Sequence, residues 1–262
     1  MTDAAVVVRR DDRGVMHVTL NRPETRNAFS DELVDQLTAA MAAAGKDESV
    51  RAVLLSGAGP CFCAGGDIEA LRRMTSLSRN ETEADSWRMD EMFRAVDDCA
   101  CPVVAKVHKA ARGGGVGLVA CADIAIVTDD TTFAFSETRL GIVPAVVSTY
   151  ALPKMQWSWA RRLLITGEVF DAHMAERIGL VHEVVAADDL EERTEAALGE
   201  VLAPRPGAQR LMKAVLRDHL DQPSHRHETS VRAVEAATAA RMSDEGRAGL
   251  EEFLNGRSSR RS

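Results

Sequence analysis

Short apolar runs alternate with longer amphipathic stretches along most of the chain. The runs "AVVVRR" and "VMHVTL" flank the polar turn "DDRG", which predicts a β-hairpin. The runs "RAVLLSG", "PVVAKV" and "ADIAIV" are continuous and short, as is typical of buried strands. After Ser30, apolar side chains recur at helical spacing (Leu33, Leu37, Met41), which predicts a helix capped by Ser30. The alternation predicts a fold of the α/β or α+β class, of which we take α/β.

The composition changes at about residue 188, where the chain becomes charged and Ala-rich and reads as helical to its end. Of the 262 residues, 45% are hydrophobic and 27% are charged, the balance of an ordinary globular protein. No apolar run approaches the roughly 18 to 20 residues of a membrane span, and the first residues lack a signal peptide's order. We therefore expect a cytoplasmic protein without membrane contact.

Charge and cysteine content exclude further classes. A net charge of −8 argues against nucleic acid as a partner. The five cysteines sit in or beside apolar runs, so we expect buried, reduced thiols. Cys61 and Cys63 are separated by one residue, as are Cys99 and Cys101, whereas zinc sites usually have two or more residues between cysteines. We expect no metal.

A glycine-rich stretch, "KAARGGGVGLVACADIAIV", raises the question of function. Gly115, Gly117 and Ala120 fit the fingerprint of a dinucleotide-binding loop. However, only about eight residues separate the glycines from Asp123, which we take as too few for a crossover helix and its return loop. The stretch does not fit a phosphate-binding loop, because no Lys-Ser or Lys-Thr follows the glycines. Two uses stay open: an oxyanion hole built from backbone N–H groups, and tight packing of a helix on a strand with no ligand.

A second glycine turn, "LLSGAGPCFCAGGDI", also follows a buried strand and precedes a helix. Together with "LNRPETRNAFS", "FAFSETRLGIVP", "TGEVFDAHMAERIGLVHEVV" and "SDEGRAGLEEFLNGR", the two glycine turns resemble, in order, the motifs of the crotonase or enoyl-CoA hydratase/isomerase superfamily. The resemblance implies a spiral core of strand-strand-helix turns with the CoA-ester site over residues 1–200. It further implies a helical trimerisation region over 201–262, with homotrimers paired into hexamers.

The resemblance also implies a reaction centre. The N–H groups of Gly66 and Gly114 would form an oxyanion hole for an acyl-CoA thioester, with no cofactor beyond the coenzyme A of the substrate. Glu137 would transfer the proton at carbon. Well-known hydratases of the family carry two glutamates, and Gly117 stands at the position of the first. Because it lacks this first glutamate, the chain looks closest to bacterial methylglutaconyl-CoA hydratase-like members, which also lack that glutamate.

Further residues are assigned to the CoA ester by the same resemblance. They are Arg22 and Arg26 near the phosphates, Ala64, Asp67 and Ile68 along the adenine and pantetheine path, and Phe253 and Arg257 from the C-terminus. Simpler roles stay open: surface charge for the two N-terminal arginines and helix capping for Asp67.

Arg139 lies two residues from Glu137, so in an extended segment both side chains would face one way. It would then pair either with a carboxylate at the far end of the substrate or with Glu137 itself. His108 and Ser136 are candidates to share the work of Glu137, although His108 stands where relatives have asparagine and a structural role is favoured.

These features favour a hydratase that adds water to a 2-enoyl-CoA, branched or carboxylated in a methylglutaconyl-like way. An enoyl-CoA isomerase is the alternative, because one base suffices to move a double bond. A non-catalytic acyl-CoA-binding or assembly subunit is the alternative of another class, since a lost glutamate would fit a decayed site.

Overall fold

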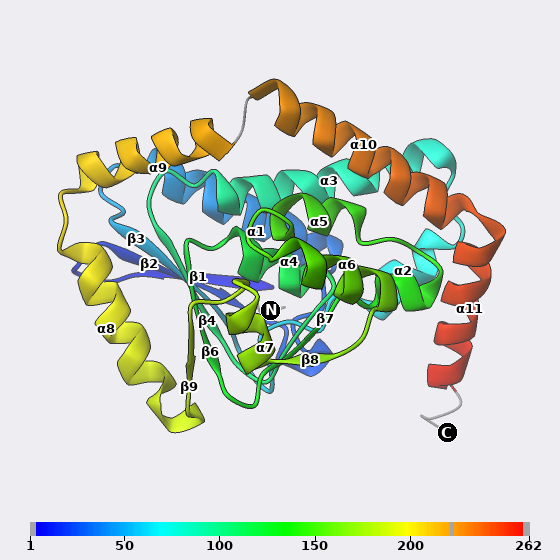
Figure 1. The fold of residues 1–262 in the computed structure, drawn as a ribbon, viewed down its shortest axis with the longest axis horizontal. Coiled ribbons are helices and arrows are strands. Elements are labelled where there is room, and N and C mark those ends of the chain that lie inside the picture. The colour runs from blue at the N-terminus through cyan, green and yellow to red at the C-terminus, as the bar shows by residue number, and fades with distance from the viewer. Residues whose placement is uncertain (1–3, 221–222, 259–262) are drawn as a thin grey trace.

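The computed structural model describes residues 4–220 and 223–258 (Figure 1). Its main sheet has six strands in the order β1-β2-β3-β4-β6-β9, and β1 alone in that sheet is antiparallel to its neighbour. A second sheet has the order β5-β7-β8. The strands are β1 Val6–Arg10, β2 Val15–Leu20, β3 Ala52–Gly57, β4 Val103–Val107, β5 Ala110–Arg112, β6 Ile124–Thr128, β7 Thr132–Ala134, β8 Phe170–Asp171 and β9 Glu183–Val185.

Helices cover both faces of the main sheet. The large core cluster joins one face to α1, α3, α4 and α5, and a smaller cluster joins the other face to α8. The helices are α1 Asp31–Lys46, α2 Ile68–Met74, α3 Arg79–Asp97, α4 Gly114–Cys121, α5 Ala145–Ala151, α6 Trp157–Thr166, α7 Ala172–Arg177, α8 Leu190–Leu202, α9 Pro206–Leu220, α10 Pro223–Met242 and α11 Asp244–Ser258. Short 3-10 turns lie at η1 Pro23–Thr25, η2 Ser136–Leu140 and η3 Ala187–Asp189.

Several local predictions are confirmed. The hairpin pairs Val6 with Leu20, and Ser30 caps α1 by accepting a hydrogen bond from the Leu33 N–H. All five cysteines are buried and free. The mixed α/β class is confirmed as well, since parallel strands alternate with helices over most of the chain.

The prediction that the stretch before Asp123 is too short for a crossover helix is wrong. The stretch before Asp123 does hold a helix, because α4 spans eight residues and its C-cap, Ala122, leads almost directly into β6. The short return works because Asp123 itself ties the connection down: its N–H donates to the Val103 carbonyl and its Oδ2 accepts from the Val103 N–H. Length therefore did not decide against a crossover helix.

The chain is helical from η3 onward in its described part, as the composition predicted (Figure 1). α8 packs on the main sheet through Ala197, Leu198 and Val201. α10 then runs along α3 and α5, and α11 lies against α2 and η2. The division at residue 200 stays a prediction. Within the described residues, no helix is both long enough and apolar enough to span a membrane.

Candidate active site

The two glycine turns lie side by side. The Cys63 N–H donates to the Ala110 carbonyl at 3.1 Å, and the Arg112 N–H donates to the Cys63 carbonyl at 3.1 Å. On its other side the first turn is tied to Phe29, whose N–H donates to the Gly65 carbonyl at 2.7 Å. These ladder-like bonds place residues 63–66 alongside residues 111–114, although the two segments are far apart in sequence.

Gly66 and Gly114 occupy equivalent places in the two turns. Gly66 precedes Asp67, the N-cap of α2, and Gly114 is the first residue of α4. The amide of neither glycine donates a hydrogen bond to any other residue that the structure describes. Amides at helix starts carry partial positive charge, so both N–H groups are available to an oxygen that gains negative charge.

Packing explains why the second turn is built of glycine. A Cβ on Gly114 would lie 2.3 Å from a Phe29 ring carbon, and one on Gly117 would lie 2.6 Å from the Phe93 ring. A Cβ on Gly115 would lie 2.9 Å from the Cys63 carbonyl. Close packing therefore requires glycine at these three positions, although the neighbours do not belong to the named strands of either sheet. This packing leaves the Gly114 amide free, so it does not decide between the two uses that the sequence left open.

Glu137 reaches the start of α4 from η2. A Cβ on Gly113, which has φ +49°, would lie 2.8 Å from Glu137 Oε1, so the carboxyl group packs against this backbone. Although the residue as a whole is half-buried, its Oε2 atom is enclosed and has no hydrogen-bond partner among the described residues. Burial raises the pKa of Glu137 from 4.5 to about 7, against smaller lowering effects of its own N–H and of Arg241.

A carboxyl group with a pKa near 7 exchanges a proton readily in either direction at neutral pH. Here it stands beside the helix start that offers the Gly114 amide. The arrangement therefore combines a proton carrier with hydrogen-bond donors for a developing oxyanion. Among the described residues, no cluster of three or more His, Cys, Asp or Glu side chains could hold a metal ion.

The predicted CoA residues near the first turn form a connected group. Arg22 Nη1 donates to Asp67 Oδ2 at 2.8 Å and to the Ala28 carbonyl at 2.7 Å. Asp67 also caps α2 by accepting from the Glu69 N–H, so the capping role is confirmed. Arg26 is exposed, with its backbone in the left-handed region (φ +58°) and its carbonyl bonded to the Ala64 N–H.

The C-terminal helix returns to this group within the same chain. Phe253 of α11 packs in a cluster with Ile68 and Leu71 of α2. Backbone packing reinforces the contact, because a Cβ on Gly249 of α11 would lie 2.3 Å from the Leu140 carbonyl of η2. Arg257 belongs to the last turn of α11, and its side chain lies outside the described part of the structure.

The prediction for the segment of Arg139 is wrong in its geometry. Residues 136–140 form a 3-10 helix, not an extended stretch, so side chains two residues apart diverge. Arg139 is exposed, and its Nε donates to the Thr166 carbonyl at 3.2 Å. His108 is likewise engaged elsewhere, with its Nε2 at 3.0 Å from the Gly59 carbonyl. Ser136 begins the turn that carries Glu137.

Sequence reasoning missed Arg241, whose charge acts on Glu137. Its Nη1 donates to Asp85 Oδ2 at 2.8 Å, and the side chains of this ion pair are only 14% and 15% exposed. Arg241 is in the last turn of α10, more than a hundred residues from Glu137 and two residues before the C-terminal motif begins at Ser243. Only the folding of α10 and α11 over the core brings it near, and no local pattern signals this.

Comparison with known proteins decides the family. The sequence model of the enoyl-CoA hydratase/isomerase family matches residues 10–260. The chain belongs to this family. It is 33% identical to a putative enoyl-CoA hydratase of Thermus thermophilus, over 76% of this chain and 79% of that protein. It is 31% identical to a crotonyl-CoA hydratase of Syntrophomonas wolfei, over 76% of each chain.

Solved structures agree. A crystal structure of an enoyl-CoA hydratase from Mycobacterium avium superposes with a TM-score of 0.85 at 32% identity, covering 97% of this chain and 98% of that one. The predicted crotonase fold is therefore confirmed, and the chain is an enzyme of the hydratase/isomerase family whose substrates are acyl-CoA thioesters. The alternative of a non-catalytic subunit is not supported.

Proposed function

We propose that this enzyme adds water across the double bond of a 2-enoyl-CoA thioester, with Glu137 as its only catalytic carboxylate. The observation that carries the proposal is the Glu137 carboxyl group, whose enclosed Oε2 atom has no hydrogen-bond partner among the described residues, beside the free Gly114 amide. The Gly66 and Gly114 amides would bind the thioester oxygen as negative charge develops on it. Losing one such donor typically costs about 3 to 4 kcal/mol of transition-state stabilisation.

The proton balance needs a single carboxyl group. Glu137, as carboxylate, takes a proton from water while the water oxygen bonds to C3 and the π electrons move toward C2 and the thioester oxygen. The protonated Glu137 then delivers a proton to C2, and the carboxylate is restored. A pKa near 7 suits both steps at neutral pH.

Double-bond isomerisation is the second candidate, and Phe93 favours it. By the family resemblance, Gly117 stands where well-known hydratases carry their first glutamate. The Phe93 ring fills the space beside Gly117, so this position offers no carboxylate to orient water. A single base can instead take a proton from C4 and return it to C2. Incubation with 2-enoyl and 3-enoyl CoA esters separates the two: hydration adds the mass of one water, and isomerisation leaves the mass unchanged while the double bond moves.

We further propose that the acyl group is carboxylated, as in a methylglutaconyl ester. Two arginines are candidates to bind that carboxylate: Arg241, which is close enough to act on Glu137, and Arg139, which is exposed and bonded to Thr166. Specificity constants for a methylglutaconyl and a crotonyl ester, measured in wild type, Arg241→Met and Arg139→Met, test this. We expect a preference of about tenfold or more for the carboxylated ester, lost in one variant only. Equal constants in wild type would refute the carboxylated substrate.

We also propose that the working enzyme is a homotrimer or a pair of trimers. α9 supports this by leaving a row of apolar side chains in solvent: Leu211 is 68% exposed, Met212 50% and Leu216 52%. A monomeric protein rarely exposes such an apolar stripe on one of its helices. The substrate's coenzyme A would bind along Arg22, Arg26, Ala64, Asp67, Ile68 and Phe253, without another cofactor. Light scattering that shows a stable monomer at micromolar concentration would contradict the oligomer.

A further inference from the structure

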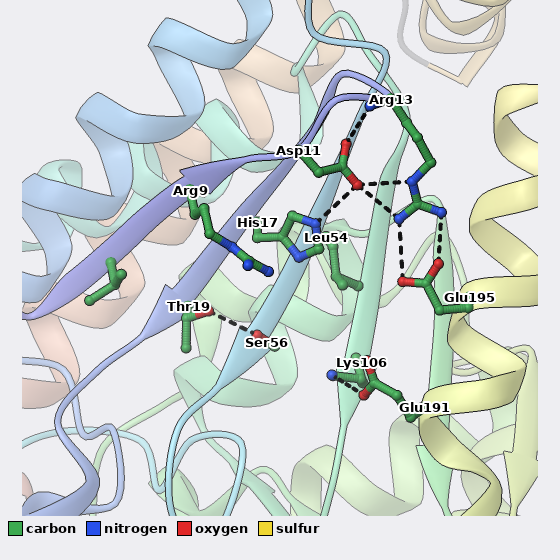
Figure 2. Close-up of a pocket in the computed structure, with 11 residues that line it drawn as sticks. Arg9, Asp11, Arg13, His17, Thr19, Leu54, Ser56, Lys106, Glu191 and Glu195 are labelled. Atoms are coloured by element: carbon green, nitrogen blue, oxygen red, sulfur yellow. Dashed lines mark hydrogen bonds and ion pairs between the residues drawn. The ribbon is translucent and has the colours of Figure 1, made fainter.

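One face of the main sheet is only partly covered. α8 packs on Leu54, Val104 and Ile126, and beyond it the same face opens into a cavity of about 410 Å³ (Figure 2). The cavity is lined by Val7, Arg9, Asp11, Arg13, His17, Thr19, Leu54, Ser56, Lys106, Glu191 and Glu195. Both its position and its residues are separate from the candidate active site, because it shares no residue with the two glycine turns or with η2.

Polar side chains line the floor of this cavity across four strands. The strand register places Val7, Thr19, Ser56 and Lys106 in one row from β1 to β4. Inner strands of a mostly parallel sheet usually carry apolar residues on both faces. Thr19 and Ser56 instead pair their hydroxyl groups at 3.2 Å, and each hydroxyl keeps capacity for one more hydrogen bond. The row is therefore built to face something polar.

The acidic residues of the lining are already neutralised. Arg13 bridges Glu195 at 2.7 Å and Asp11 at 2.8 Å, and Lys106 bonds to Glu191 at 2.6 Å. Burial by itself would raise the pKa of Asp11, but hydrogen bonds from the Val15 N–H and Arg13 lower it to about 2. All three carboxylates are thus anions held by cations or N–H donors, and they leave no unmet negative charge.

Arg9 is the exception among the charged groups of the lining. It has no ion pair or side-chain hydrogen bond with any residue in the described part of the chain. The register places Arg9 opposite His17, in the row next to Thr19 and Ser56, and in Figure 2 its guanidinium extends from β1 across β2, between His17 and the Thr19–Ser56 pair. A free guanidinium beside two hydroxyl groups offers several donors to one tetrahedral anion.

We infer that this cavity binds the phosphoryl group of a small metabolite, through Arg9 and the Thr19 and Ser56 hydroxyls. The apolar Val7 and Leu54 side chains border the same space and suit the carbon part of such a ligand. The volume lies in the range of small-molecule sites. The inference does not rest on the proposed reaction, since it uses none of the residues assigned to it.

Calorimetric titration of the whole protein with inorganic phosphate, at constant ionic strength set with chloride, tests the site. The titration is done without coenzyme A, and the Arg9 and Arg10 variants described below distinguish this cavity from the candidate active site. We expect one saturable site per chain. Arg9→Met should weaken binding about tenfold or more, because a charge-assisted hydrogen bond is lost.

Arg10→Met is the matched control. Arg10 is the next residue of β1, but it points to the other side, where it bonds to the Ser49 carbonyl and Asp47. Its loss should change phosphate affinity less than twofold. Ser56→Ala should weaken binding severalfold without loss of fold, checked by thermal melting. No binding in wild type, equal losses in both arginine variants, or equal affinity for acetate would overturn the inference.

Discussion

Two positions along the start of α4 differ in what they offer to chemistry. At Gly113 the backbone meets the Glu137 carboxyl group, whose Oε2 atom is enclosed and has no hydrogen-bond partner among the described residues. One turn later, at Gly117, the backbone meets the ring of Phe93, which is fully buried and packs on Tyr150 at a centroid distance of 5.5 Å. By our proposal the first position serves proton transfer, whereas the second serves packing. A change at each should therefore have a different readout.

Removing the Glu137 carboxyl group should have the largest effect. Glu137→Gln keeps size and polarity but carries no transferable proton, so turnover of the preferred CoA ester should fall about 100-fold or more. Binding of the ester should change little. The comparison variant is Glu48→Gln, an exposed residue away from the site, which should keep full activity. Unchanged turnover in Glu137→Gln would remove this residue from the mechanism.

The same carboxyl group should make stability fall as pH rises. Because its pKa is raised from 4.5 to about 7 in the folded state, the folded protein holds this proton more tightly than the unfolded chain. Its contribution is fully present below pH 4.5 and is lost as pH rises to about 7, by roughly 3 kcal/mol at most. Urea unfolding at a series of pH values should show this slope in wild type and not in Glu137→Gln. Parallel curves would contradict the raised pKa.

The Gly117 position should respond through packing. Gly117→Glu would place new atoms against Phe93 and should cost about 2 kcal/mol of stability, without raising hydration activity. Phe93→Ala in the same chain should recover part of that cost, since it makes room. A double-mutant cycle by denaturant unfolding measures the coupling between the two. Additive losses would show that Phe93 is not what keeps this position a glycine.

Replacing Arg241 should have the smallest effect of these changes, a shift in the pH dependence of activity. Its positive charge lowers the pKa of Glu137, so Arg241→Met should move the pH midpoint of activity upward. Arg139→Met should leave the midpoint in place, because Arg139 is exposed and bonded to Thr166. A pH–rate profile of each variant provides the measurement. A shift of the same size in both would mean that Arg241 has no particular link to Glu137.

Local sequence patterns predicted those parts of the molecule that depend on near neighbours. The β1–β2 hairpin, the Ser30 cap and the buried cysteines all follow from a few adjacent residues. The resemblance placed Glu137 and Gly114 in motifs that do meet in space. The hairpin, the cap and the cysteines share one cause: the signal and the structure it specifies lie within one or two elements.

The failures depend on contacts between distant segments. Nothing near Gly117 in the sequence reveals Phe93, and nothing near Glu137 reveals Arg241. Residues 136–140 form a 3-10 turn and not the extended segment that we expected. The C-cap of this turn, Gly141, packs closely against Glu245 of α11. The turn packs against a helix that begins more than a hundred residues later in the sequence, and a local pattern does not contain that contact.

The contact between α11 and the turn of Glu137 has a consequence for the candidate site. Gly141 packs against the Glu245 carbonyl, and the Leu140 carbonyl fits against Gly249, so the turn is held by a helix that begins more than a hundred residues further along the chain. A substitution that loosens α11 would therefore move Glu137 relative to the two glycine turns without altering either turn.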